Sequence, residues 1–123
     1  MAKPLALVIE DDYDAAEIMT EALQMAGYDV SVYRDGTSAQ EGIAAQQPDL
    51  VALDLHLPGV DGEMLLKQIR SDDRLKDTRV MLATADDRLS QQLEGDANMV
   101  LLKPISFAQL HTLAKRFIST LGQ

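Results

Sequence analysis

Acidic side chains follow two short apolar runs of the sequence. Glu10, Asp11 and Asp12 come directly after the first run. Asp54 comes after another run and is followed by the apolar Leu55, so it does not belong to a charged face. Carboxylates that share a partly buried site repel one another unless a cation joins them, and hard oxygen ligands of this kind suit Mg²⁺. Because a carboxylate can also attack phosphorus and form an acyl phosphate, these acids indicate a Mg²⁺ site for phosphoryl transfer.

A hydroxyl and a lysine follow two further apolar runs. Thr84 and Ala85 come after one run, and Lys103 comes after the next. Phosphoryl transfer mainly requires positioning and neutralisation of the charge on the three equatorial oxygens. Mg²⁺ would take one oxygen, the Lys103 ammonium another, and the Thr84 hydroxyl with the Ala85 amide the third. This set includes no evident base for activating water, which argues against fast hydrolysis.

Each of these residues also has an ordinary structural explanation. Acids at the start of a helix stabilise the helix dipole. A single threonine is more often a loop hydroxyl, and a single lysine is usually a solvated surface residue. The indication of chemistry comes from their shared position after strands, because sites of open α/β sheets lie beyond the carboxyl ends of the strands.

Five short segments have the composition of strands. The runs 5–9, 50–53, 80–83 and 99–102 are continuously apolar, which suits parallel strands covered on both faces. The segment 29–33 alternates polar and apolar residues, which suits an edge strand. The four runs that carry chemistry at their ends are therefore expected to be parallel strands whose two faces are both covered.

Helical patterns fill the intervals between these segments. Gly27 is placed to end the first helix, Asp12 or Asp14 to cap its start, and Ser106 to cap the last helix. The expected helices cover 15–26, 36–47, 62–70, a short stretch within 87–98, and 107–121. Strand and helix thus alternate five times. This order predicts one doubly wound α/β domain over residues 1–123, with a parallel sheet between two helical layers.

Charge and composition exclude several other classes. The chain carries 20 acids and 11 bases, a formal net charge of −9, whereas a nucleic-acid-binding surface needs a basic stripe. It has no cysteine, which excludes disulfides, thiolate metal sites and cysteine nucleophiles. No apolar run approaches the roughly 20 residues of a membrane span, and the N-terminus lacks the apolar segment of a signal peptide. We therefore expect a cytoplasmic protein whose domain binds neither nucleic acid nor membrane.

Four strings of the sequence resemble the receiver domains of bacterial two-component response regulators. The most specific string has the pattern D-x-x-L-P-G-x-D-G. The resemblance covers essentially the whole chain, and it implies a flavodoxin-like (βα)5 fold with strand order 2-1-3-4-5. The strings are VIEDD at 8–12, LDLHLPGVDG at 53–62, ATA at 83–85 and LKP at 102–104.

The resemblance assigns a role to each acid. It implies that Asp54 is the phosphoacceptor of a phosphorelay. Glu10 and Asp11 match the paired acids that hold Mg²⁺, and Asp54 with the backbone carbonyl of His56 completes the protein ligands. The implied phosphoryl donor is a histidine kinase or a histidine phosphotransfer domain. The phosphorylated protein would then signal by a change of conformation.

The resemblance also concerns the switch and the lifetime of the phosphoryl group. Thr84 matches the switch hydroxyl, and Lys103 matches the family's lysine, whose bond to Pro104 is usually cis. The protein is expected to be a self-phosphorylating acceptor with slow autodephosphorylation rather than a conventional enzyme. Residues two after the phosphoacceptor and two after the threonine flank the path of the hydrolytic water in receivers. Here they are His56 and Asp86, and we expect both to affect the rate of dephosphorylation.

Two departures from the family pattern fall on its usual output face. Receivers usually carry an aromatic residue three positions before the lysine, where this chain has Val100. Valine has few rotamers and no polar tip, so it cannot signal by exchanging a buried for an exposed position. The interval from Thr84 to Lys103 is also roughly three residues shorter than usual, so the helix within 87–98 is expected to be short. We therefore predict that the response concentrates near Asp54, Thr84 and the first helix.

Other functions agree with parts of the pattern. A small phosphohydrolase with an aspartyl nucleophile would carry a second acid two residues after Asp54, where His56 stands. A degenerate receiver would be a protein-binding module without phosphorylation, against which the complete set of acids, threonine and lysine argues. Within the receiver interpretation, the chain is a stand-alone regulator, or the receiver of a hybrid sensor kinase or of a longer regulator with an effector domain.

Overall fold

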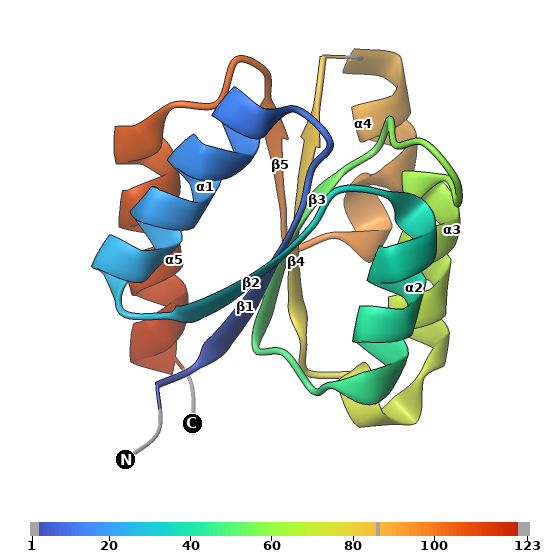
Figure 1. Ribbon diagram of the computed structural model, residues 1–123, viewed down its shortest axis with the longest axis horizontal. Coiled ribbons are helices and arrows are strands. Elements are labelled where there is room, and N and C mark those ends of the chain that lie inside the picture. Colours follow the sequence, from blue (N-terminus) through green and yellow to red (C-terminus); the bar gives the residue numbers. More distant parts are fainter. Residues whose placement is uncertain (1–2, 86, 121–123) are drawn as a thin grey trace.

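A five-stranded parallel sheet forms the centre of the molecule, with helices on both of its faces (Figure 1). The computed structural model describes residues 3–85 and 87–120. The strands are β1 (Leu5–Ile9), β2 (Asp29–Tyr33), β3 (Leu50–Asp54), β4 (Arg79–Thr84) and β5 (Met99–Leu102). The helices are α1 (Tyr13–Ala26), α2 (Gly36–Ala45), α3 (Gly62–Ser71), α4 (Asp87–Leu93) and α5 (Phe107–Thr120), with 3-10 helices η1 (Asp73–Leu75) and η2 (Glu94–Asp96).

The strands lie side by side in the order β2-β1-β3-β4-β5, and all neighbouring pairs are parallel. This order confirms the flavodoxin-like fold that the resemblance implies. β3 is buried along its whole length, whereas β2, at a free edge of the sheet, is partly exposed. The continuously apolar run and the alternating run thus mark an interior strand and an edge strand, as the sequence predicts.

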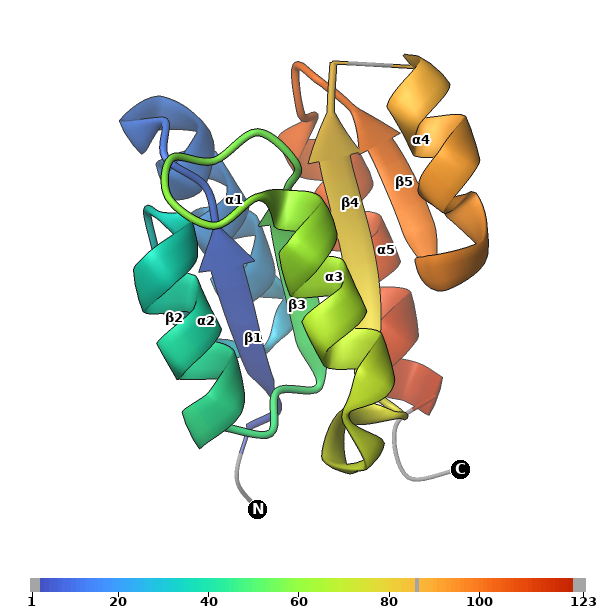
Figure 2. The same ribbon diagram turned by 90° about the vertical axis from the view of Figure 1, so that its right-hand side faces the viewer.

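The helices divide between the two faces of the sheet. α1 and α5 pack side by side on one face, while α2, α3 and α4 cover the other (Figures 1 and 2). Two separate clusters of buried side chains result. One includes Val8, Leu23 and Leu110, and the other includes Leu53 and Leu66. Because neighbouring residues of a strand point to opposite faces, a continuously apolar strand such as β3 supplies both clusters.

The ends of α1 and α5 follow the local signals of the sequence. The side chain of Asp12 caps α1 by accepting a hydrogen bond from the Asp14 amide at 3.0 Å, which decides between the two expected caps. Gly27 ends α1 in the left-handed conformation, with φ of 113°. The Ser106 hydroxyl accepts a hydrogen bond from the Gln109 amide at 3.2 Å. Each of these signals acts within one turn, so the sequence predicts both helices, although α1 begins at Tyr13, two residues before the expected start. The expected end of the last helix at Leu121 lies outside the described residues.

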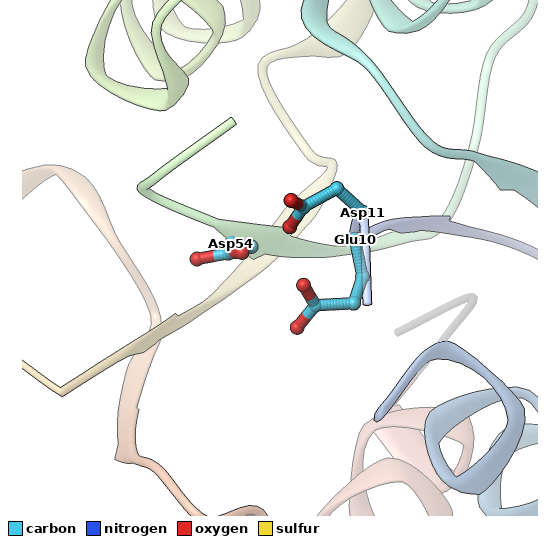
Figure 3. A group of neighbouring side chains, drawn as sticks. All are labelled: Glu10, Asp11 and Asp54. Atoms are coloured by element: carbon cyan, nitrogen blue, oxygen red, sulfur yellow. The ribbon is translucent and has the colours of Figure 1, made fainter. Parts of the chain in front are cut away.

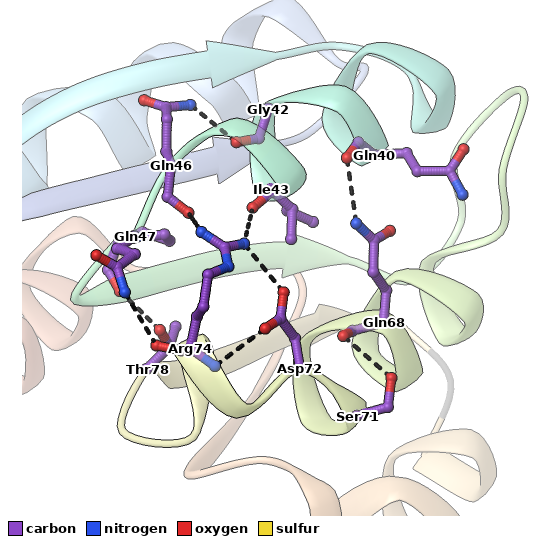
Figure 4. Close-up of polar contacts among 11 residues, drawn as sticks. Gln40, Gly42, Ile43, Gln46, Gln47, Gln68, Ser71, Asp72, Arg74 and Thr78 are labelled. Carbon is purple, nitrogen blue, oxygen red and sulfur yellow. Dashed lines mark hydrogen bonds and ion pairs between the residues drawn. The ribbon is translucent and has the colours of Figure 1, made fainter.

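α2 ends at Ala45, two residues earlier than the sequence predicts. Gln46 is extended, and its side-chain amide donates back to the Gly42 carbonyl at 3.1 Å. The guanidinium group of Arg74 donates to the Ile43 and Gln46 carbonyls at 3.2 and 3.1 Å (Figure 4). The last carbonyls of the helix are therefore satisfied by side chains, so the helix can stop there.

α4 has seven residues, which confirms the short fourth helix. Arg70 of α3 binds the segment that follows α4. Its guanidinium group donates to the Asp96 carbonyl at 2.7 Å, to the Asn98 side chain at 2.9 Å and to the Thr78 carbonyl at 2.9 Å. These bonds tie η2 and the start of β5 to α3 and to the segment before β4.

Tyr28, which lies between α1 and β2, ties this part of the chain to α5. Its side chain is buried, and its hydroxyl donates to the Ala114 carbonyl of α5 at 2.9 Å. Burial and the nearby Asp49 carboxylate raise the pKa of Tyr28 to about 12, although Arg79 opposes the shift. The folded protein thus holds this phenol in its neutral form.

We expect Tyr28→Phe to lower the free energy of unfolding by about 1 kcal/mol, because a buried hydrogen bond is lost while the ring remains. Urea unfolding followed by circular dichroism measures this difference. Tyr13→Phe is the matched control, because the side chain of Tyr13 is 71% exposed and its loss of a hydroxyl should change little.

A second readout comes from high pH. The pKa of Tyr28 is higher in the folded than in the unfolded chain, so its contribution to stability is complete below about pH 10 and is lost as the pH rises toward 12. The free energy of unfolding should fall less steeply above pH 10 in Tyr28→Phe than in the parent. Equal slopes in the two proteins would contradict the assignment.

Candidate active site

Three carboxylates meet at the carboxyl end of the sheet. One oxygen from each of Glu10, Asp11 and Asp54 lies within 4.8 Å of the others, and the groups point toward one another (Figure 3). Ile9 pairs with Leu53 across β1 and β3, so Glu10 and Asp54 extend from neighbouring strand ends. Glu10 and Asp54 are buried and Asp11 is exposed. The structure therefore brings together the three acids that the sequence singles out.

The backbone fixes both buried acids. The Glu10 amide donates to the Tyr33 carbonyl at 3.0 Å, and the Glu10 carboxylate accepts a hydrogen bond from the Asp12 amide at 3.3 Å. The Asp54 carboxylate accepts a hydrogen bond from the His56 amide at 3.0 Å. Each carboxylate is thus oriented by the loop that follows its own strand.

Lys103 lies between the two buried acids. Its Nζ is 2.7 Å from Glu10 Oε1 and 3.2 Å from Asp54 Oδ2. Its backbone amide donates to the Thr84 carbonyl at 2.9 Å, and its peptide bond to Pro104 is cis, as the resemblance implies. The Lys103 side chain therefore points into the site. The pairing with Glu10 was not expected, because it depends on how the loops after β1 and β5 meet.

The burial and proximity of these charges shift the pKa values of Glu10 and Lys103. Burial, reinforced by Asp54, raises the pKa of Glu10 to about 7, against the opposing effects of Lys103 and the Asp12 amide. Burial lowers the pKa of Lys103, but hydrogen bonds and charge from Glu10 and Asp54 outweigh it, so the net pKa is raised. Three carboxylates meet here while Lys103 pairs with two of them, so the site favours a further cation.

The remaining expected residues lie beside this cluster. Thr84 is buried at the end of β4, and the exposed Ala85 follows it. His56 is exposed, and it contacts the site through its backbone amide, which donates to the Asp54 carboxylate. Asp86 lies outside the described residues. Val100 is half-buried and packs against the cluster that contains Leu53 and Leu66.

Gly62 has a structural role that the sequence analysis missed. A Cβ atom at this position would lie 2.6 Å from the Asp54 carbonyl oxygen and 2.6 Å from Leu55 Cα. Only a residue without a Cβ allows the first turn of α3 to pack directly on the end of β3. The last glycine of the D-x-x-L-P-G-x-D-G string was the available signal, but the string alone does not say which part of the backbone that glycine contacts.

Residues 6–115 match the family described as the response regulator receiver domain. This match includes every residue of the site described above. The chain belongs to this family. It is a receiver domain of the kind found in two-component response regulators, and the acidic cluster fits the active site of such a domain.

Individual receivers support the same conclusion. The chain is 36% identical over 110 residues to the DNA-binding dual master transcriptional regulator RpaA of Synechocystis, in a match that covers 87% of the chain and 46% of RpaA. The chain spans about half the length of the curated relatives that it matches.

Among its described residues, no helix combines the length and apolar character required to cross a membrane.

Two solved structures resemble the chain closely. The receiver domain of a signal transduction histidine kinase from Syntrophus aciditrophicus has a TM-score of 0.84 and 28% identity, and the match covers 98% of this chain and 93% of that one. The receiver domain of a sensor histidine kinase from Pseudomonas aeruginosa has a TM-score of 0.85 and 25% identity, with 97% and 100% covered. That second structure holds a magnesium ion in its active-site cleft.

We predict that millimolar Mg²⁺ raises the melting temperature of this receiver, because a bound cation relieves the repulsion among the three carboxylates. The increase should be much smaller in Asp11→Ala, which removes one ligand of the cluster. Asp73→Ala is the matched control, because it removes an exposed acid of η1 at the opposite end of the molecule. Differential scanning calorimetry with and without Mg²⁺ provides the measurement, and equal increases in all three proteins would exclude the site.

Proposed function

We propose that residues 1–123 form a single receiver domain in which Asp54 accepts a phosphoryl group from a phosphohistidine of a partner protein. The observation that carries this proposal is the position of Asp54. Its carboxylate is buried at the end of β3, next to Glu10 and Asp11 and 3.2 Å from the Lys103 ammonium group. A nucleophilic carboxylate, candidate metal ligands and a fixed cation thus lie in one place.

The donor set fits Mg²⁺. Glu10, Asp11 and Asp54 would supply carboxylate oxygens, and the backbone carbonyl of His56 would supply a fourth protein oxygen. Hard oxygen ligands that leave positions for water and phosphate are what Mg²⁺ prefers. When bound, the ion would neutralise part of the charge that the acids and the phosphoryl group bring together.

The protein groups would carry out a single displacement. A bond forms between an Asp54 carboxylate oxygen and phosphorus, while the phosphorus–nitrogen bond of the donor breaks and the imidazole takes up a proton. The Lys103 ammonium group would neutralise one equatorial oxygen. The Thr84 hydroxyl and the Ala85 amide would bind another, which couples the phosphorylated state to the loop after β4.

The donor is either a histidine kinase or a histidine phosphotransfer domain, and we place the reaction in the cytoplasm. Support for the donor class comes from the family itself, since both solved relatives described above are receivers of histidine kinases. Because the chain spans about half of its curated relatives, an effector or kinase domain of a longer parent chain is the proposed output partner.

This receiver is proposed to turn over slowly rather than to act as a phosphohydrolase. A hydrolase of the aspartyl type would use an acid two residues after Asp54, where His56 stands with an exposed imidazole. The complete set of acids and the inward lysine also favours phosphorylation over a degenerate binding module. Autodephosphorylation would then be slow, because the position where such an acid would stand is taken by His56.

We expect Asp54→Asn to abolish incorporation of a phosphoryl group from a small acyl phosphate in the presence of Mg²⁺. The amide is a poor nucleophile toward phosphorus, whereas the shape of the side chain is preserved. Asp61→Asn is the matched control, because Asp61 lies in the same loop and serves as the N-cap of α3, a position that asparagine also fills well.

Intact-mass measurement decides the result. The parent and Asp61→Asn should each gain the mass of one phosphoryl group, and Asp54→Asn should gain none. Equal incorporation in Asp54→Asn and the parent would refute Asp54 as the acceptor.

A separate prediction concerns output. Val100 is half-buried where receivers usually carry a mobile aromatic side chain, and α4 has only seven residues. We therefore expect beryllofluoride, a mimic of the phosphoryl group, not to produce a symmetric dimer through the face of α4, β5 and α5. Sedimentation velocity with and without beryllofluoride measures this, with amide shift mapping to locate the response. A tight beryllofluoride-dependent dimer centred on residues 87–100 would show the expectation to be wrong.

A further inference from the structure

The amino end of α2 packs directly on the loop that follows the phosphoacceptor strand. This loop covers residues 55–61 and passes over the start of α2 (Figure 2). A Cβ atom on Gly36 would lie 1.9 Å from the Val60 carbonyl oxygen and 2.4 Å from the Val60 nitrogen. The Gly36 amide donates to the Pro58 carbonyl at 2.8 Å. Backbone therefore meets backbone, with no flexible side chain between them that could yield.

Gly36 is not required by the conformation of its own backbone. The positive φ angles among the described residues are at Gly27 and Gly59, and Gly36 has none. At the first position of a helix, alanine would ordinarily be tolerated or slightly favoured, because it reduces the entropy of the unfolded chain. The contact with the loop, rather than backbone conformation, therefore accounts for the glycine at position 36.

α2 cannot easily withdraw from this contact. Arg74 of η1 binds the last carbonyls of α2, and the Gln68 side chain of α3 donates to the Gln40 carbonyl at 3.2 Å (Figure 4). These bonds hold the middle and the end of the helix against its neighbours. A larger residue at position 36 would therefore displace the loop rather than the helix.

The loop is held in a second way by the same helix. Gly59 adopts a φ of 86°, and a Cβ atom there would lie 3.1 Å from the Thr37 hydroxyl and 3.3 Å from the Thr37 nitrogen. Gly59 thus needs both the left-handed conformation and the open space above α2. Together, the contacts of Gly36 and Gly59 fix the middle of the loop. Gly59 itself lies three residues after His56.

We propose that Gly36 is a positioning residue for the phosphoacceptor site: through Pro58 and Val60, the start of α2 sets the place of the His56 carbonyl. This inference rests on the proposed function, because the His56 carbonyl matters there as a ligand of Mg²⁺. The start of the loop is fixed by the bond from the His56 amide to Asp54, and its end by Gly62. Between these two points, α2 restrains the loop, although α2 contributes no side chain to the site.

The test compares Gly36→Ala with Gly42→Ala. Gly42 lies in the same helix, and a Cβ atom there would meet the Tyr33 ring at 2.4 Å, so both variants introduce a clash. Only Gly36 faces the loop. Mg²⁺ affinity is measured by amide chemical shifts without any phosphoryl donor, and the Mg²⁺ dependence of phosphorylation by a small acyl phosphate is measured separately.

Gly36→Ala should weaken Mg²⁺ binding by about tenfold, the lower end of the effect typical for groups that orient metal ligands. The Mg²⁺ concentration for half-maximal phosphorylation should rise by a similar factor, and the rate at saturating Mg²⁺ should change much less. Gly42→Ala should retain the Mg²⁺ affinity of the parent even where its melting temperature falls. Gly59→Ala, which disturbs the same loop from its other side, should shift the affinity in the direction of Gly36→Ala.

Parental Mg²⁺ affinity in Gly36→Ala would overturn the inference, whatever the affinity of Gly59→Ala. So would an equal loss of affinity in Gly42→Ala, because the effect would then reflect a general loss of stability. A parent protein that binds Mg²⁺ but takes up no phosphoryl group would instead refute the proposed function, so the two failures are distinguishable.

Discussion

The pairing of one ammonium group with two buried carboxylates is the interaction on which the rest of this receiver depends. Lys103 reaches Glu10 and Asp54 at 2.7 and 3.2 Å, and Asp11 adds a third carboxylate at the surface. Buried charges are costly unless they are paired, and here the pairing is incomplete. The raised pKa of Glu10 has the same origin, because its charge is buried beside that of Asp54. A bound divalent cation and a phosphoryl group would together alter the charge balance of the site.

The fold explains how such unfavourable groups are brought together. β1, β3 and β4 are anchored by apolar residues on both faces, so the polar residues at their ends have no freedom to separate. The lysine enters from the residue that follows β5. Glycines then allow the surrounding helices to approach the backbone, as Gly62 does at Asp54 and Gly36 does at Val60. Hydrophobic packing of the sheet thus provides the stability that the site itself lacks.

Much of this arrangement could be predicted from the sequence, because it depends on local patterns. A continuously apolar run predicts an interior strand, and the residue after it must then lie at the carboxyl edge, which is why Asp54 and Thr84 were identified. Contacts between distant segments were not predictable in this way. The Glu10–Lys103 pair, the early end of α2 at Arg74 and the contact of Gly36 with Val60 each depend on how separate loops and helices meet.

The most direct test of the account is a crystal structure of this receiver with Mg²⁺ and beryllofluoride. The account predicts beryllium bonded to an Asp54 carboxylate oxygen, with Lys103 turned from Glu10 toward a fluoride. It also predicts Mg²⁺ held by the carboxylates of Glu10, Asp11 and Asp54 and by the backbone carbonyl of His56. Beryllofluoride on another carboxylate, or a Lys103 that stays paired with Glu10 while the site is filled, would contradict it.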